Sequence, residues 1–241
     1  MRPLRDHEAH PLSPPPGAPV HVFISAGHRN RTGGGAPGEA ALTRPYAEAY
    51  AEAFAGHGFS VHFMQRTAKS RDGCFNGTIR QVAYAILRQA RVLPGDRLVM
   101  LDLHMDALHS DPGVFTIVPD DPTVPTGTRD PAADVWENNP RAVALGHAIA
   151  RSISRWTGLE QRQCRELGVM SERETRVGSS GRRLSMFRVT APLRDRLIRL
   201  LIEHGSLGRD AAILHDPATP RACAEAAAAA VESFFHPRPA P

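Results

Sequence analysis

Lysine and cysteine are both scarce in this sequence. All but one of the 29 lysine and arginine residues are arginine, and the formal net charge is +4. Such a charge could attract an anionic polymer, but no block of like charges stands out along the chain, so an arginine-rich coding bias is the better explanation. We therefore expect no nucleic-acid partner. The three cysteines, Cys74, Cys164 and Cys223, are far apart and form no Cys-x-x-Cys pair, which excludes a zinc knuckle and a disulfide framework.

Long apolar runs are absent as well. No stretch of 18 apolar residues occurs, so no membrane span is expected. The first residues carry charges and prolines where a secretory signal needs a continuous apolar segment. We expect a protein that is cytoplasmic as synthesised and that reaches any outside target by lysis or non-classical export. With 41% hydrophobic and 22% charged residues, the bulk of the chain has the composition of a folded protein.

The length of 241 residues suits one domain. Residues 1–18 contain a run of prolines and are expected to form a flexible leader. Residues 237–241 are expected to form a flexible tail. The folded and, as argued below, catalytic domain is therefore predicted to span residues 19–236.

Short β-rich apolar runs alternate with longer helical segments, which predicts an α/β fold. The expected strands are 20–25, 59–64, 97–104, 113–118, 184–189 and 196–203. The expected helices are 41–58, 76–95, 139–158 and 219–235. Asn76 is a candidate N-cap, Pro140 stands early in its helix and Gly158 late. Six strands suit one sheet, and the helices have the apolar spacing needed to cover it, so we predict a single three-layer domain.

Two long segments, 119–139 and 164–183, fit neither strand nor helix. Loops of this length in a compact domain are often functional, so both are predicted to form walls of a substrate groove. Trp136, in the first segment, could stack on a sugar ring. Trp156 lies at helical spacing and is expected in the core.

Polar residues that bind metals follow three of the apolar strands. His28 comes just after the first strand, His104 ends "RLVMLDLH" and Glu203 ends "RLIRLLIE". Open α/β sheets bind their ligands at the ends of strands. Glu39, at the start of the first helix, could return to His28 through the glycine-rich stretch between them. Singly, each histidine could be satisfied by backbone groups and Glu39 by its helix N-terminus, but an ionised Glu203 beside the core needs a specific reason.

This set of residue types matches catalytic zinc. Such an ion commonly has three protein ligands from histidine and carboxylate and a water in the fourth position, whose pKa falls to about 7. A second carboxylate can then transfer the proton of that water to a leaving group. Two histidines and two glutamates therefore suffice for a zinc hydrolase with one metal ion. The glycines after His28 are not a phosphate loop, because the Lys-Ser/Thr ending is missing.

The motifs "SAGHRN" followed by Glu39, then "DLHMDA", then "LLIEHGSLGRDAAIL" resemble the zinc-dependent N-acetylmuramoyl-L-alanine amidases of the amidase-3 type. The order and spacing agree over residues 20–235. The resemblance implies a twisted mixed, mostly parallel sheet with helices on both faces. It implies that His28, Glu39 and His104 bind zinc and that Glu203 is the catalytic carboxylate. The implied reaction is hydrolysis of the amide between N-acetylmuramic acid and L-alanine in peptidoglycan, so the expected partner is peptidoglycan or a peptide derived from it.

The sequence departs from the family pattern at several positions. Ser25 replaces an aspartate, Asp106 replaces the asparagine of His-x-Asn-Ala, and 204–207 replaces a more apolar Glu-x-Gly-Phe ending. The loop from His28 to Glu39 is also short. None of these changes removes a proposed ligand.

Other polar residues are candidates for binding substrate. Asp106 and His204 are expected near the site, although a surface position also suits His204. Arg182 or Arg183, in "GSSGRR", could bind a peptide carboxylate, unless that stretch is an ordinary loop.

Two other functions remain open on the sequence. One is a related zinc amidohydrolase or peptidase acting on another acylated peptide or amino acid, for which Asp106 and the unusual loops are the motivation. The other is a catalytically inactive peptidoglycan-binding relative. The pairing of Glu203 with three ligands argues against it, because a binder needs no proton shuttle. The sequence gives no oligomeric state.

Overall fold

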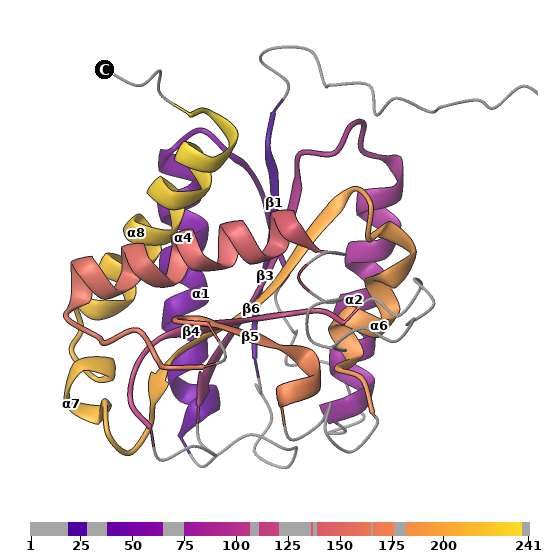
Figure 1. Ribbon diagram of the computed structural model, residues 1–241. Coiled ribbons are helices and arrows are strands. Elements are labelled where there is room, and N and C mark those ends of the chain that lie inside the picture. The colour runs from indigo at the N-terminus through magenta and orange to yellow at the C-terminus, as the bar shows by residue number, and fades with distance from the viewer. Residues whose placement is uncertain are drawn as a thin grey trace, which may run out of the picture.

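The protein is an α/β domain built on one six-stranded sheet (Figure 1). The computed structural model describes residues 19–27, 38–64, 75–106, 111–120, 136, 139–164, 166–175 and 182–237. The strand order is β2-β1-β3-β6-β4-β5. The strands are β1 (His21–Ala26), β2 (Ser60–Phe63), β3 (Leu98–Asp106), β4 (Phe115–Val118), β5 (Val169–Ser171) and β6 (Leu197–Ser206).

The first four strands in this order are parallel, β4 is antiparallel to β6, and β5 is parallel to β4. The predicted mixed, mostly parallel sheet is therefore confirmed. Because β1, β3 and β6 are neighbours and parallel, their carboxyl ends meet at one edge of the sheet. β3 and β6 are buried along almost their whole length, as expected for central strands covered on both faces.

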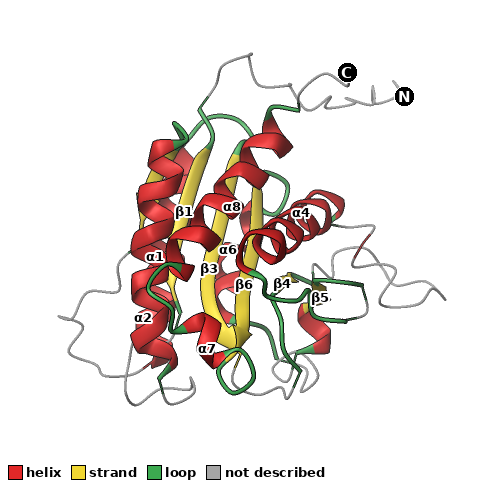
Figure 2. Ribbon diagram, turned by 90° about the vertical axis from the view of Figure 1, so that its left-hand side faces the viewer, coloured by secondary structure: helices red, strands yellow, loops and turns green. Residues whose placement is uncertain are grey.

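Helices cover both faces of the sheet (Figures 1 and 2). On one face lie α1 (Glu39–Gly56), α4 (Pro140–Thr157) and α8 (Thr219–Phe235), and on the other lie α2 (Phe75–Val92) and α6 (Ser185–Thr190). Alternation along each strand divides the core between the two layers. In β1, Val22 and Ile24 pack toward α1 and α8, whereas Phe23 packs toward α2.

The described residues also include short elements: α7 (Ala211–Leu214) and the 3-10 turns Glu172–Glu174 and Ala191–Leu193. Pro140 is the first residue of α4, and Gly158 ends that helix with a φ of 77°, as its position predicts. Asn76 lies inside the first turn of α2, not at its N-cap, because α2 begins at Phe75. Among the described helices, none is long and apolar enough to cross a membrane.

Two predictions about elements are wrong. Residues 184–189, expected as a strand, begin α6: Met186, Phe187 and Thr190 are its buried residues, a spacing that fits one face of a helix. The sixth strand is instead β5, within a segment expected to be a loop. It has only three residues at the sheet edge, too few for an alternating pattern to be visible in the sequence. Trp156 is also not in the core, because it is 58% exposed near the end of α4.

Candidate active site

The candidate site lies where β1, β3 and β6 end. His104 of β3 is in register with Glu203 of β6, and Gly27 follows β1 and donates its N–H to the Leu103 carbonyl over 2.7 Å. Glu39, the first residue of α1, is 3% exposed and reaches the same edge. Three of the four residues predicted to form the site are therefore close together. His28 and the loop to Glu39 lie outside the described residues, so their placement stays a prediction.

His104 lies between two buried carboxylates. Its Nδ1 is 3.1 Å from Glu39 Oε1, and its Nε2 is 3.0 Å from Asp102 Oδ2. Burial by itself would lower the pKa of His104, but the charge and hydrogen bond of Asp102, followed by Glu39 and Glu203, raise that pKa to about 10. Without a metal the ring is therefore a cation, held as the counter-ion of the surrounding carboxylates.

Asp102 is a site residue that sequence reasoning missed. It is 2% exposed in the middle of β3, and Ser25 donates its hydroxyl proton to Asp102 Oδ1 over 2.5 Å. A carboxylate that holds one ring nitrogen of a histidine fixes the direction of the other, which is the usual arrangement behind metal-binding histidines. An aspartate in an otherwise apolar strand, two residues before a histidine on the same face, was the available signal. The serine at position 25 therefore takes part in the site by orienting Asp102.

Gly27 provides the space in which the His104 ring lies. A Cβ atom at this position would be 2.5 Å from His104 Cε1, 2.6 Å from its Nδ1 and 2.6 Å from the Leu103 carbonyl oxygen. Its own carbonyl accepts a hydrogen bond from the Thr43 hydroxyl over 2.8 Å, which ties the end of β1 to α1. The glycine of "SAGH" is thus required by close approach of the ring.

Glu203 presents a buried carboxylate oxygen without a partner. Its Oε2 has no hydrogen bond among the described residues. Burial raises the pKa of Glu203 to about 8; His104 lowers that pKa, and the nearby Glu39 and Asp106 raise it. An unsatisfied buried carboxyl costs stability, and such a group is characteristic of functional sites.

Asp106 and Arg162 form a buried ion pair beside Glu203. An Arg162 N–H donates to Asp106 Oδ2, and another donates to the backbone carbonyl of Asp111. The guanidinium carbon lies 4.6 Å from the centre of the Phe115 ring, and Phe115 is in register with Glu203. Arg162 was not predicted, because it follows α4 by several residues and only the fold brings it to the end of β3. Asp106 is thus paired within the protein.

His204 points away from the strand edge into the α1 layer. It is fully buried, its Nε2 is 2.8 Å from the Tyr50 hydroxyl, and its Nδ1 is 3.0 Å from the His104 carbonyl oxygen. Burial lowers the pKa of His204 to about 4, so the ring is neutral. This placement makes His204 a support for the backbone of His104 and does not favour a direct contact with substrate.

Arg182 and Arg183 are placed apart from this cluster. Arg183 donates to Glu172 Oε2 over 3.2 Å and to the Asp120 carbonyl. Asp120 follows β4, which runs antiparallel to β6 and therefore leads away from the end that carries Glu203. Arg182 is exposed just before α6.

The described donor atoms suit a zinc ion. No three metal-binding side chains among the described residues form a complete site, which is expected while the predicted ligand His28 is outside them. Two donors about 2.1 Å from one tetrahedral Zn²⁺ are roughly 3.4 Å apart, near the 3.1 Å between His104 Nδ1 and Glu39 Oε1. The orphaned Glu203 oxygen and the carboxylate behind Nε2 add the nearby base and the outer support that such a site needs.

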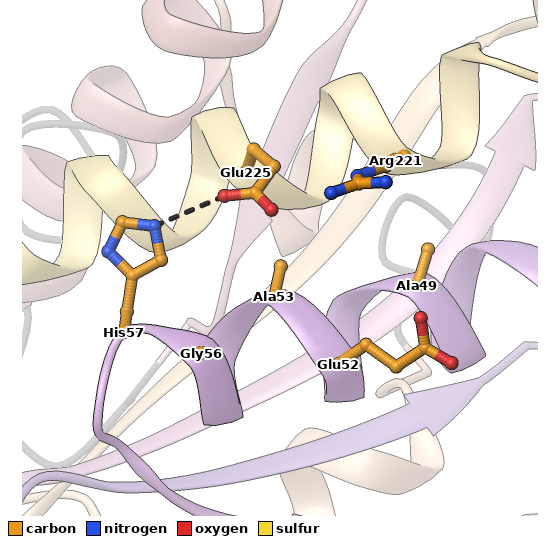
Figure 3. Close-up of a pocket in the computed structure, with 7 residues that line it drawn as sticks. All are labelled: Ala49, Glu52, Ala53, Gly56, His57, Arg221 and Glu225. Atoms are coloured by element: carbon orange, nitrogen blue, oxygen red, sulfur yellow. Dashed lines mark hydrogen bonds and ion pairs between the residues drawn. The ribbon is translucent and has the colours of Figure 1, made fainter.

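A separate cavity lies between α1 and α8 (Figure 3). It is lined by Ala49, Glu52, Ala53, Gly56, His57, Arg221 and Glu225. None of the strand-end residues contributes to it, so this cavity is not the candidate active site.

Solved structures with the same fold were found by comparison. The Ami1 N-acetylmuramyl-L-alanine amidase from Mycobacterium smegmatis matches 92% of this chain and 100% of its own, with a TM-score of 0.61 and 13% identity. The CwlD amidase from Clostridioides difficile, solved in complex with the GerS lipoprotein, matches 90% and 98%, with a TM-score of 0.60 and 13% identity. Cwp6 from Clostridium difficile has 18% identity and a TM-score of 0.59; the match covers 90% of this chain and 29% of Cwp6.

The protein therefore has an amidase-type α/β fold. More specifically, the fold is that of the N-acetylmuramoyl-L-alanine amidases, over nearly the whole chain. At 13–18% identity this likeness concerns the fold. No model of a known protein family and no curated protein matches the sequence.

Proposed function

We propose that this protein is a zinc-dependent N-acetylmuramoyl-L-alanine amidase that hydrolyses the amide between N-acetylmuramic acid and L-alanine in peptidoglycan. The observation that supports this most is the strand-end cluster. Glu39 Oε1 and His104 Nδ1 lie 3.1 Å apart, and Glu203 keeps a buried oxygen without a partner beside them. The amidase fold and the motif resemblance support the choice of substrate.

Each residue of the cluster has a defined part in this proposal. His28, Glu39 and His104 would hold one zinc ion, and Asp102 would keep the His104 ring in the orientation that frees Nδ1. A zinc ion bound there would supply a Lewis acid for the scissile carbonyl and lower the pKa of a coordinated water. The pKa of about 8 of Glu203 is that of the metal-free site, and the positive charge of a bound zinc would favour its ionised form. Glu203 would then accept the proton of the attacking water and deliver it to the leaving amine of L-alanine, since its free oxygen is buried at that edge.

The second candidate, a zinc amidohydrolase acting on another acylated peptide, depends on Asp106. Its carboxylate is paired with Arg162, so this wall of the site is an ion pair where the resembled family has an asparagine. Such a wall would favour a substrate whose groups differ from those of the muramyl peptide. Both candidates use the same zinc and the same Glu203.

The deciding experiment is digestion of purified sacculi with and without a chelator. We expect free N-terminal L-alanine to appear with zinc and to disappear when zinc is removed. Release of a different amine end would favour the second candidate, and zinc binding without any cleavage would support an inactive relative. A Glu203→Gln variant should keep its zinc and lose about 10²- to 10⁴-fold in rate. Cleavage by this variant at the wild-type rate would contradict the role given to Glu203.

A further inference from the structure

Helix α2 carries a line of exposed arginines on its outer face. Arg80, Arg88 and Arg91 are exposed, and so is Tyr84, which is 52% exposed. At 100° per residue these four positions fall within about 80° of one another around the helix. The three arginines, called here the arginine stripe, span roughly 16 Å along the helix axis. Three positive charges that are scattered in the sequence are therefore brought into one row.

Among the residues that the structure describes, the arginine stripe has no counter-charge. Helix α2 contains no aspartate or glutamate. Across the part of the chain that the structure describes, none of the three guanidinium groups has a hydrogen-bond or ion-pair partner. The neighbouring α6 adds a fourth exposed arginine, Arg188. Like charges held this close without compensation favour binding of an anion with several charged groups.

In the opposite helical layer several charged side chains pair within the protein, although α4 also carries two exposed arginines, Arg151 and Arg155. There Arg44 pairs with Glu48, and His57 lies between Glu225 and Glu232. Figure 3 shows His57 and Glu225 in contact across the cavity between α1 and α8. The α2 layer thus holds the longer row, with three exposed arginines on one helix and Arg188 on the neighbouring α6.

The stripe leads to the edge of the sheet that carries the candidate site. β2 runs parallel to β1, so the chain leaves β2 at the carboxyl edge before α2 begins. The other end of α2 is at the amino edge, where Arg196, just before β6, donates to the Gly95 carbonyl over 2.9 Å. Arg80 is therefore the arginine of the stripe nearest the site, and Arg91 the farthest. A linear polymer on this row would extend toward the strand ends.

We propose that the arginine stripe of α2 binds anionic repeats of the same peptidoglycan polymer whose amide is cleaved at the strand ends; this inference rests on the proposed function. The stem peptides of that polymer carry free carboxylates at regular intervals, and guanidinium groups bind carboxylates in a two-pronged geometry. Tyr84 lies between Arg80 and Arg88 and offers a ring face to an amino sugar. Because the Arg80 end of the stripe lies toward the carboxyl edge of the sheet, where the candidate site is, we favour the substrate polymer over a nucleic acid.

The test measures binding to insoluble sacculi by co-sedimentation, in a Glu203→Gln background that leaves the polymer intact. The test variant is Arg80→Gln, Arg88→Gln, Arg91→Gln, and the matched control is Arg151→Gln, Arg155→Gln, Arg221→Gln. The control removes the same charge from exposed arginines of the α4 and α8 layer. We expect about tenfold weaker binding for the test variant and less than about twofold for the control, since exposed charge contacts each contribute modestly. Sacculi with amidated carboxylates should bind both variants equally weakly.

Several outcomes would overturn the proposal. One is binding of the test variant to sacculi at the wild-type level. Another is an equal loss of sacculus binding in the test and control variants, which would mean that only net charge matters. Loss of binding to single-stranded DNA with sacculus binding unchanged would assign the stripe to nucleic acid. With the native Glu203, cleavage of a soluble muropeptide should be the same for the test variant and wild type. Stripe-dependent binding without any cleavage would contradict the proposed function and leave the binding surface intact.

Discussion

Two histidines in this protein are each held between two carboxylates, and they differ in their surroundings. His104 lies between Glu39 and Asp102 at 3.1 and 3.0 Å, at the carboxyl edge of the sheet. His57 lies between Glu232 and Glu225 at 2.9 and 3.2 Å, beside the cavity of Figure 3. The residue types and distances are nearly the same at the two places.

Burial separates the two clusters. The side chain of His104 is 7% exposed, and its two carboxylates are 3% exposed; the His57 side chain is 24% exposed, and Glu232 is 50% exposed. In the buried cluster the charges act through a low dielectric and raise the pKa of His104 to about 10. Among the described residues, a buried carboxylate oxygen without a hydrogen bond lies beside His104, at Glu203, and none lies beside His57. The cluster around His57 joins α1 to α8, whereas the buried cluster around His104 has the donors and the unsatisfied carboxylate that the proposed zinc site requires.

The largest difference is expected when each histidine is replaced by glutamine. His104→Gln should lose bound zinc and about a thousandfold in amidase rate, since the metal contributes several kcal/mol to the transition state. His57→Gln should keep its zinc and stay within about twofold of the wild-type rate. Metal analysis of the purified proteins and the sacculus assay measure both effects, and circular dichroism checks that His104→Gln is folded. Equal losses in the two variants would remove the distinction between the clusters.

A smaller difference is expected when the glycine beside each of the two histidines is replaced by alanine. Gly27→Ala would place a Cβ atom 2.5 Å from His104 Cε1, so we expect a cost of about 1–3 kcal/mol in unfolding free energy and a displaced ring with weaker zinc binding. Gly56→Ala, next to His57, meets nothing within 4 Å. It should be neutral or stabilising by less than about 1 kcal/mol. Denaturant unfolding measures the change in stability of the two variants, and zinc titration measures their affinity for the metal. Wild-type zinc affinity in Gly27→Ala would show that the His104 ring does not need the space left by Gly27.

The smallest effect concerns pH and the surface cluster. Partial burial acts to lower the pKa of His57, but the hydrogen bonds and charges of Glu232 and Glu225 raise it above its ordinary value. A raised pKa means that the folded protein binds the proton more tightly than the unfolded chain. The stabilisation is therefore complete below the unfolded pKa of about 6.5 and is lost as pH rises through the higher folded pKa.

The corresponding measurement compares unfolding of wild type and His57→Gln from pH 5 to pH 9. At pH 5 we expect the unfolding free energy of wild type to exceed that of His57→Gln by less than about 1 kcal/mol, because the ion pairs of His57 are partly solvated. At pH 9 this difference should vanish. A difference in unfolding free energy that grows with pH would contradict the raised pKa of His57.

Much of the fold could be predicted from the sequence because periodicity reports local structure. The four long helices and five of the six strands were found within a few residues. The errors came from short elements: α6 has six residues, and β5 has three. In such lengths a pattern with period 2 and one with period 3.6 are hard to distinguish, and packing decides between them.

The site divides in the same way. Glu39, His104 and Glu203 could be proposed because each stands where an apolar strand ends or a helix begins. Asp102 was overlooked although it stands two residues before His104 on the same face of β3. Its contact with Ser25, 77 positions away, and that of Arg162 with Asp106, 56 positions away, could not be assigned in advance. Contacts between such distant positions follow from strand register and from the path of the chain after α4.

The sequence by itself determined the α/β pattern and the polar residues at the strand ends, since both follow from the local order of apolar and polar residues along the chain. Only the tertiary structure decided which polar groups are buried together, because that depends on strand register. Strand register and the packing of α1 set His104 beside Glu203 and Glu39 in the core, whereas His57, with equally close carboxylates, lies at the surface. The tertiary structure also collected arginines that form no block in the sequence into one row on α2, because a helix turn brings every third or fourth residue to the same face.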